Sequence, residues 1–232
     1  MFIKNFIRSL TIITTLVLVG CGGGGGGGSN DVPSDRLLVF SLFPPGYFEG
    51  NYSDSTSLKG SFSNGDNVTG TLRVQSGSTT IFNSQPVITF DLQLSLTNTT
   101  TGATAAVSSE GYFSNDINNL TIVGGLNITD GVVTMATSTS IFPLTGSIGD
   151  FGNIGSYTLS DGTTNTRSWA LDDGFNGNAK LVITTVSKDS SNVLEFTEVN
   201  TSTISQDGTI LRTDITVTYH QLGNEILTLS GS

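Results

Sequence analysis

Cysteine and histidine are almost absent from this chain of 232 residues, which has one of each, Cys21 and His220. One cysteine cannot form a disulfide within the chain, so the hydrophobic core and the hydrogen-bond ladders must hold the fold together. One histidine excludes a three-histidine zinc site and any mechanism that needs a histidine pair. These two scarcities remove disulfide-rich scaffolds and multi-histidine zinc enzymes from consideration.

Charged residues are also scarce, at 12% of the sequence, which is about half the usual share. The balance is acidic, with nine Lys and Arg against 19 Asp and Glu, and loss of Lys4 and Arg8 with an N-terminal signal leaves a net charge of about −12. Phosphate backbones and anionic lipid surfaces repel a domain with this charge. We therefore predict no nucleic-acid partner.

Residue constellations for catalysis are lacking. The sequence has no G-x-S-x-G nucleophile motif, and its G-x-G-x-x-G matches lie in a glycine tract with no strand before them or helix after them. Asp214 shares a predicted strand face with His220 but lies six residues away, roughly 20 Å along a strand, so the two form no bonded dyad. His220 is predicted to be a solvated rim residue. Trp169 is predicted to pack in the core or at the rim, with ligand stacking as the alternative.

Metal and carboxylate motifs are equally weak. The segment Asp172–Asn178 has the oxygen donors and glycines of a calcium loop, but Ile183 stands where an EF-hand needs its bidentate glutamate, so a hairpin loop is favoured. Glu195 and Glu198 are three apart on a predicted strand and should face opposite sides. We predict no catalytic, cofactor-binding or metal-binding residue, and hence no enzyme, although a carboxylate pair from distant strands remains open.

The N-terminus has the layout of a signal peptide. Two cations, Lys4 and Arg8, precede an apolar stretch at 10–19 that is too short for the roughly 20 residues of a membrane-spanning helix. Residues 1–20 are therefore predicted to be removed. An ordinary secretory signal is the alternative to the more specific interpretation that follows.

The end of this segment, Leu18-Val19-Gly20-Cys21, resembles the lipobox of bacterial lipoproteins. This resemblance implies that the Cys21 thiol receives a diacylglycerol, that cleavage occurs before Cys21, and that the new amino group is acylated. Two or three acyl chains make a stable membrane anchor, at about 0.8 kcal/mol per buried methylene. Gly22 in place of Asp after the cysteine implies the outer membrane if the envelope is Gram-negative. The membrane is thus the one partner that the sequence predicts.

Residues 21–36 are predicted to be a disordered, glycine-rich tether. Seven glycines follow Cys21, at 22–28. A flexible chain of about 14 residues has an end-to-end reach on the order of 20 Å. The folded part, residues 37–232, should therefore stay near the membrane to which Cys21 is attached.

The folded part has the periodicity of β-strands. Apolar and polar residues alternate strictly over Val87–Thr97, and Ile210–Gln221 shows the same period of two. Weaker strands are predicted at 68–75, 103–113, 132–137, 179–186, 193–201 and 225–230. Asn-Gly and Asp-Gly turns separate them, and no segment of a dozen residues has a helical apolar period. Asp35–Phe43 fits either a short helix or a first strand.

These elements predict an all-β antiparallel meander, which must cover its apolar face as a sandwich, a barrel or a half-barrel. One domain is preferred, with a seam near 145–155 left open. The predicted function is that of an envelope lipoprotein with a non-catalytic β-domain in a binding or structural role, its protein, glycan or lipid ligand unspecified. A carrier of lipid or another apolar ligand is the first alternative, and an envelope hydrolase ranks last.

Overall fold

The computed structural model describes residues 38–232. Cys21, the predicted signal peptide at 1–20 and the predicted tether at 21–36 lie outside the described residues. No helix of the described part is long and apolar enough to cross a membrane.

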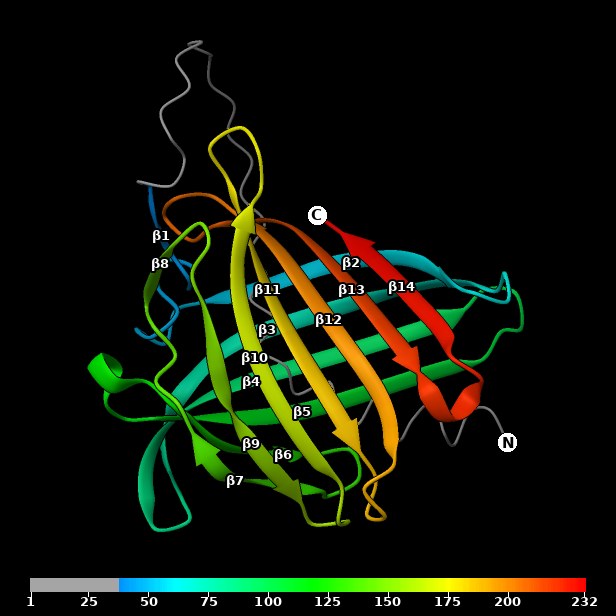
Figure 1. Ribbon diagram of the computed structural model, residues 1–232, viewed down its shortest axis with the longest axis horizontal. Helices are drawn as coiled ribbons and strands as arrows, with labels where there is room; N and C mark the ends of the chain where they lie inside the picture. Colours follow the sequence, from blue (N-terminus) through cyan, green and yellow to red (C-terminus); the bar gives the residue numbers. More distant parts are fainter. Residues whose placement is uncertain (1–37) are drawn as a thin grey trace.

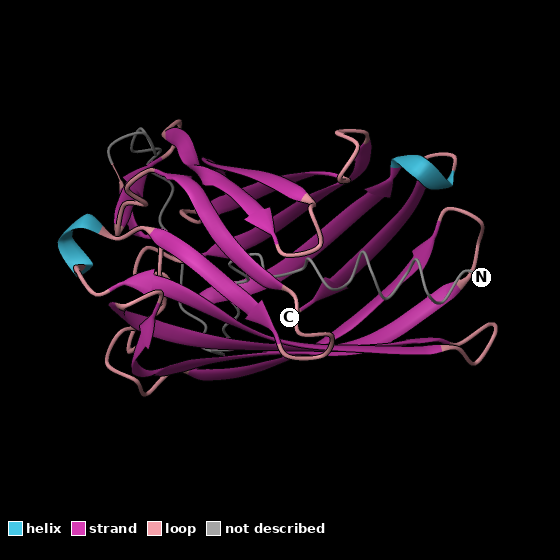
Figure 2. Cartoon of the chain, turned by 90° about the horizontal axis from the view of Figure 1, so that it is seen from below, coloured by secondary structure: helices cyan, strands magenta, loops and turns pink. Residues whose placement is uncertain are grey.

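Twelve of the strands in residues 38–232 form a closed antiparallel barrel (Figures 1 and 2). They are β2 (Ser53–Phe62), β3 (Asn67–Phe82), β4 (Gln85–Asn98), β5 (Thr104–Ser114), β6 (Ile122–Asn127), β7 (Val133–Thr139), β9 (Phe151–Leu159), β10 (Thr164–Asp173), β11 (Ala179–Lys188), β12 (Leu194–Ile204), β13 (Ile210–Tyr219) and β14 (Glu225–Gly231). Neighbours in sequence are neighbours in the sheet, except where β7 pairs with β9 and where β14 closes the barrel on β2. The all-β prediction is confirmed, and of its three architectures the barrel is the one that forms.

The segment before the barrel closes one end of it. β1 (Val39–Ser41) pairs with β8 (Thr145–Ser147), and the Ser41 amide donates to the Gln206 carbonyl in the β12–β13 turn. Behind β1, Phe43 packs edge-on against Phe113 and Phe142 at centroid distances of 5.9 and 5.4 Å. We call this the capped end. Within the described part of Asp35–Phe43, the strand β1 forms, as one of the two alternatives predicted. Phe43 is buried because its ring packs against these two phenylalanine rings.

The predicted strands are present, and most are longer than their apolar pattern indicated. β4 covers the alternating Val87–Thr97 segment, with Phe90, Leu92 and Leu94 buried inside the barrel. The prediction of a strand to residue 221 was wrong at its end, because a 3-10 helix, η3 (His220–Leu222), follows β13 and Gly223 ends it with a φ of 73°. β2, β6, β8, β9 and β10 had not been predicted.

The unpredicted strands have weak apolar alternation because polar residues or glycines occupy many inward positions. On β10 the inward side chains are Asn165, Arg167, Trp169 and Leu171, so only the second half of the strand shows apolar alternation. Residues 145–155 comprise β8, a turn closed by a hydrogen bond from the Asp150 amide to the Ser147 carbonyl, and the start of β9. β9 pairs with both β7 and β10, so this region leads directly into the barrel wall.

Candidate ligand pocket

A pocket of about 580 Å³ lies at the end of the barrel opposite the capped end. We call this end the mouth; its turns include 63–66, 99–103 and 220–224. Residues from the mouth ends of β2, β3, β4, β5, β13 and β14, together with these turns, line the pocket. Its apolar members are Phe62, Val68, Ala103, Tyr219 and Leu222. A volume of this size falls within the range of small-molecule sites.

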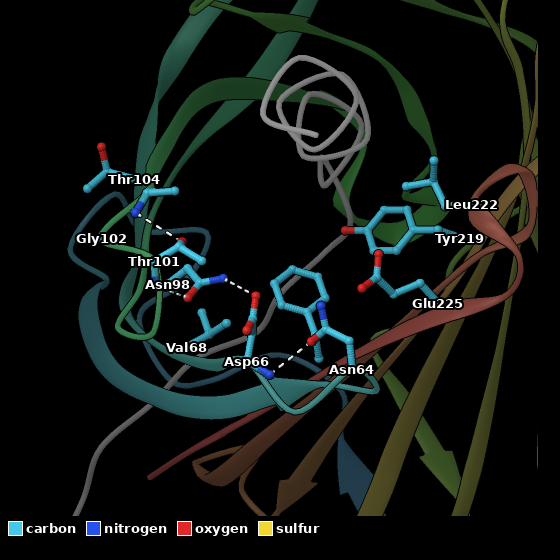
Figure 3. A pocket seen from close by; sticks show the side chains of 12 residues that line it. Asn64, Asp66, Val68, Asn98, Thr101, Gly102, Thr104, Tyr219, Leu222 and Glu225 are labelled. Carbon is cyan, nitrogen blue, oxygen red and sulfur yellow. Dashed lines mark hydrogen bonds between the residues drawn. The ribbon is translucent and has the colours of Figure 1, made fainter. Parts of the chain in front are cut away.

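One side of the pocket is a hydrogen-bonded pair of turns (Figure 3). Asn98 Nδ2 donates to Asp66 Oδ2 at 2.9 Å, and the Asp66 amide donates to Asn64 Oδ1 at 2.9 Å. The amides of Thr100 and Thr101 both donate to Asn98 Oδ1 at 3.0 Å. Asn98 therefore joins the β2–β3 turn to the β4–β5 turn, which gives this side of the pocket a defined shape.

The opposite side carries Tyr219, Leu222 and Glu225, and the Tyr219 hydroxyl points across the pocket (Figure 3). Tyr219 is 3% exposed, and its hydroxyl has no hydrogen-bond partner among residues 38–232. Buried hydroxyls are normally bonded, so this one is available to a ligand.

The electrostatics of the mouth are acidic. Asp66 and Glu225 both line the pocket. Burial raises the pKa of Tyr219, and the nearby Glu198 and Glu225 carboxylates raise it further, so the phenol stays protonated at neutral pH. The pocket therefore offers an apolar surface, the neutral Tyr219 hydroxyl and a carboxylate rim, which suits binding more than proton transfer.

Residues that the sequence singled out lie apart from one another. His220 contacts Thr197 Oγ1 through Nε2 and Asn224 Oδ1 through Nδ1, each at 3.0 Å. Asp214 instead binds Arg212 and Ser230 on the outer surface. The prediction that His220 and Asp214 form no dyad is confirmed.

The other predictions on single residues also have clear outcomes. Asp172–Asn178 spans the end of β10 and its hairpin turn to β11, where the Phe175 amide donates to Asp173 Oδ1 at 2.8 Å. Trp169 packs edge-on against Phe142, with centroids 5.8 Å apart, as the core interpretation predicted. Glu195 and Glu198 face opposite sides of β12, and Glu198 is fully buried inside the barrel.

Sequence reasoning missed the polar residues inside the barrel. Asn165, Arg167, Thr185, Ser187, Glu198, Asn200 and Thr213 all face inward and are at most 4% exposed. The signal was present in β12, where Glu198 and Asn200 share the inward period with Phe196. It was hidden because alternation identifies a strand face but does not say whether polar members of that face point to solvent or to an interior.

Within residues 38–232, no group of three or more His, Cys, Asp or Glu side chains is placed to hold a metal ion. The arrangement at the mouth can hold a molecule that is partly apolar, by surface contact and by a hydrogen bond to Tyr219. No family model matches the chain, and neither a curated protein nor a solved structure matches it.

Proposed function

We propose that this chain is a membrane-anchored lipoprotein of the cell envelope whose barrel binds an apolar or amphiphilic small molecule without converting it. The anchor part rests on the Leu18-Val19-Gly20-Cys21 motif and the glycine tract after it. The binding part rests on one observation, the pocket of about 580 Å³ at the mouth of a closed barrel. The non-catalytic β-domain and the carrier, which the sequence kept as alternatives, are thereby combined.

The width of the barrel supports a binding role. Eight strands give an interior that side chains just fill or that holds one small ligand, and barrel diameter grows with strand number. Twelve strands surround more space, and here the turns at the mouth shape part of it into a pocket with Val68 and Phe62 on its surface. The capped end, by contrast, is filled by Phe43, Phe113 and Phe142. Access is therefore from the mouth.

The binding part is tested with a neutral fluorescent apolar dye, phenylnaphthylamine, and the processed chain from its native membrane, against a detergent-matched blank. Saturable binding is expected. Ala103→Trp should fill the pocket and weaken binding by about tenfold or more, since lost contact of this kind is worth at least about 1.4 kcal/mol. Ala106→Trp, on the exposed outer face of β5, is the matched control and should bind as the parent does. Equal binding by the Ala103→Trp variant would reject the pocket as the site.

The anchor part is tested separately by the intact mass of the membrane-extracted chain beside a Cys21→Ser variant. Acyl mass on the parent and none on the variant is expected. An unacylated parent in its native host would remove the anchor from the proposal and leave the pocket result untouched.

A second candidate function is docking of a protein partner at the capped end. Phe151 and Phe175 are 81% and 66% exposed, on β9 and in the β10–β11 turn, both at that end. Exposed aromatic side chains of this size are typical of interaction surfaces. A double Phe151→Ser, Phe175→Ser variant that loses a cross-linked envelope partner but keeps dye binding would favour this candidate over the carrier.

A further inference from the structure

A cluster of buried polar side chains lies on the inner face of the barrel wall, away from the pocket's own lining. It consists of Tyr157 on β9, Asn165 and Arg167 on β10, and Thr185 and Ser187 on β11, and we call it the inner polar cluster. Arg167 is directly opposite Thr185 in the strand register, and Asn165 is opposite both Tyr157 and Ser187. Directly opposite residues have Cβ atoms about 5 Å apart, so the five side chains form one patch.

Every member of the inner polar cluster has polar atoms without a partner in the described part of the chain. These atoms are Nε and Nη2 of Arg167, Nδ2 and Oδ1 of Asn165, the Tyr157 hydroxyl, Thr185 Oγ1 and Ser187 Oγ. In folded proteins the large majority of buried polar atoms are hydrogen-bonded, and a buried charge is paired. Seven such atoms in one patch point to a ligand that the patch is built to bind.

Arg167 sets the charge of that ligand. Burial lowers the pKa of its guanidinium, while Tyr157 and Glu198 act in the opposite direction, and arginine keeps its proton in proteins. Its charged carbon lies 4.9 Å from the centroid of the Tyr157 ring, a contact with the ring face that leaves the in-plane N–H groups free to donate. Gly155, directly opposite Arg167, leaves room for the Tyr157 hydroxyl, which would lie only 2.9 Å from a Cβ at that position. A guanidinium edge with two free donors matches a carboxylate or phosphate group.

Glu198 is the acidic group nearest to this patch in the register, and it does not take the place of the ligand. Thr185 lies between Arg167 and Glu198 in the strand pairing. Glu198 Oε1 accepts from Asn200 Nδ2 at 2.5 Å, and Arg167 Nε and Nη2 have no acceptor within residues 38–232. The carboxylate thus favours the charged form of Arg167 electrostatically but leaves these two nitrogens for a ligand.

The inner polar cluster is connected to the mouth. One cross-strand row of the sheet links the pocket to the cluster. Tyr219 of the pocket is opposite Phe196, Phe196 is opposite Ser187, and Ser187 is opposite Asn165. The row of Arg167 is two residues deeper, about 7 Å along the strand. In the order around the barrel β4 is six strands from β11, so Leu92 and Leu94 lie on the opposite wall. A ligand entering at the mouth meets a polar wall on one side and an apolar wall on the other.

We propose that the barrel binds an anionic amphiphile, with its carboxylate or phosphate head on Arg167 and its hydrocarbon chain against β3, β4 and the mouth pocket. This inference rests on the proposed function and specifies the ligand class. Trp169, the single tryptophan of the chain, lies on the same inner face two residues from Arg167 and reports on the site directly.

The test uses quenching of Trp169 fluorescence by stearate brominated at carbon 2, next to its carboxylate, because bromine quenches only a tryptophan that it contacts and Trp169 lies beside the proposed position of the head. With the processed full chain, the brominated acid should quench saturably. The brominated alcohol of the same length should bind at least about tenfold more weakly, because it lacks the charged oxygens that the guanidinium donors bind. Arg167→Gln should remove the advantage of the acid, and Arg167→Lys should retain part of it. Arg212→Gln, at an exposed ion pair with Asp214, is the matched control and should behave as the parent.

Each outcome separates this inference from the proposed function. Equal quenching by acid and alcohol, or by parent and Arg167→Gln, would overturn the anionic head while the carrier stands. Competition by inorganic phosphate as strong as that of the acid would overturn the amphiphile in favour of a free anion. Failure of the acid, the alcohol and the neutral dye together would overturn the proposed function itself. A thermal unfolding curve shows whether the Arg167→Gln variant is folded. If it is not, the preference for acid over alcohol is compared between the parent and the Arg167→Lys variant, and an undiminished preference in that variant overturns the role of Arg167.

Discussion

The two walls of the barrel interior differ in what they contribute. The inner face of β3 and β4, the apolar wall, carries Leu72, Val74, Leu92, Leu94 and Leu96, all at most 2% exposed. The inner face of β10 and β11, the polar wall, carries the inner polar cluster beside Trp169, Leu171 and Ile183. Burial of an aliphatic side chain stabilises the fold, whereas burial of an unpaired hydroxyl or guanidinium opposes it. We infer that the apolar wall stabilises the fold, whereas the polar wall lowers the stability of the ligand-free chain and serves ligand binding.

The largest expected effect lies on the apolar wall. Leu72→Ala removes a fully buried side chain opposite Leu94 and should lower the free energy of unfolding by about 2–5 kcal/mol. Denaturant unfolding of parent and variant measures the difference. A loss below 1 kcal/mol would mean that this wall is not tightly packed, and the comparison of the walls would fail.

The next effect tests how closely the strands approach at the closure of the barrel. A methyl group at Gly60 would collide with the carbonyl oxygen of Thr228 on β14, the strand that closes the barrel on β2. Gly60→Ala should therefore cost about 1–3 kcal/mol in the same measurement, because the backbone must shift. Ser57→Ala, on the exposed face of β2, is the control and should unfold at the parent's denaturant concentration.

A smaller effect of opposite sign is expected on the polar wall. Thr185 is fully buried, and its hydroxyl has no partner in the part of the chain that the structure describes, so Thr185→Val removes a buried polar atom at nearly constant volume. The ligand-free chain should become more stable by about 1 kcal/mol. Binding of the brominated acid should weaken at the same time. A stability loss instead would show that the hydroxyl is bonded in the native chain, which would contradict the assignment of this wall to a ligand.

The smallest effect concerns the outer face of the apolar wall. Asp91 on β4 is opposite Glu110 on β5, and burial raises the pKa of both carboxyls, with Asp91 also raising that of Glu110. A raised pKa in the folded state means that stability is greatest at low pH and is lost as pH rises through the raised values. Asp91→Asn should therefore stabilise the fold at neutral pH by about 0.2–1 kcal/mol, and not at about pH 3, where both groups are protonated. Unfolding at the two pH values gives the difference, and an equal gain at both would contradict the charge explanation.

The sequence predicted most of the strands, but it did not predict which residues come together to form the candidate pocket. The Asn64-Gly65-Asp66 turn was identified from its composition, and Tyr219 was placed on the apolar face of its strand with Ile215 and Val217. That these two elements form opposite sides of one pocket depends on the pairing of β14 with β2, which joins segments more than 160 residues apart. Pairings at such separations leave no periodic signal in the sequence.

By itself the sequence determined the all-β class, eight of the twelve barrel strands and the acidic charge, because period two and residue composition are local properties of the chain. It also predicts the Cys21 anchor, outside the described residues. Only the tertiary structure decided that the sheet closes into a barrel, since a meander can cover its apolar face in several ways. Closure also decided that Arg167, Thr185 and Glu198 are buried, because the same alternation places a residue in solvent on an open sheet and in an interior once the sheet closes.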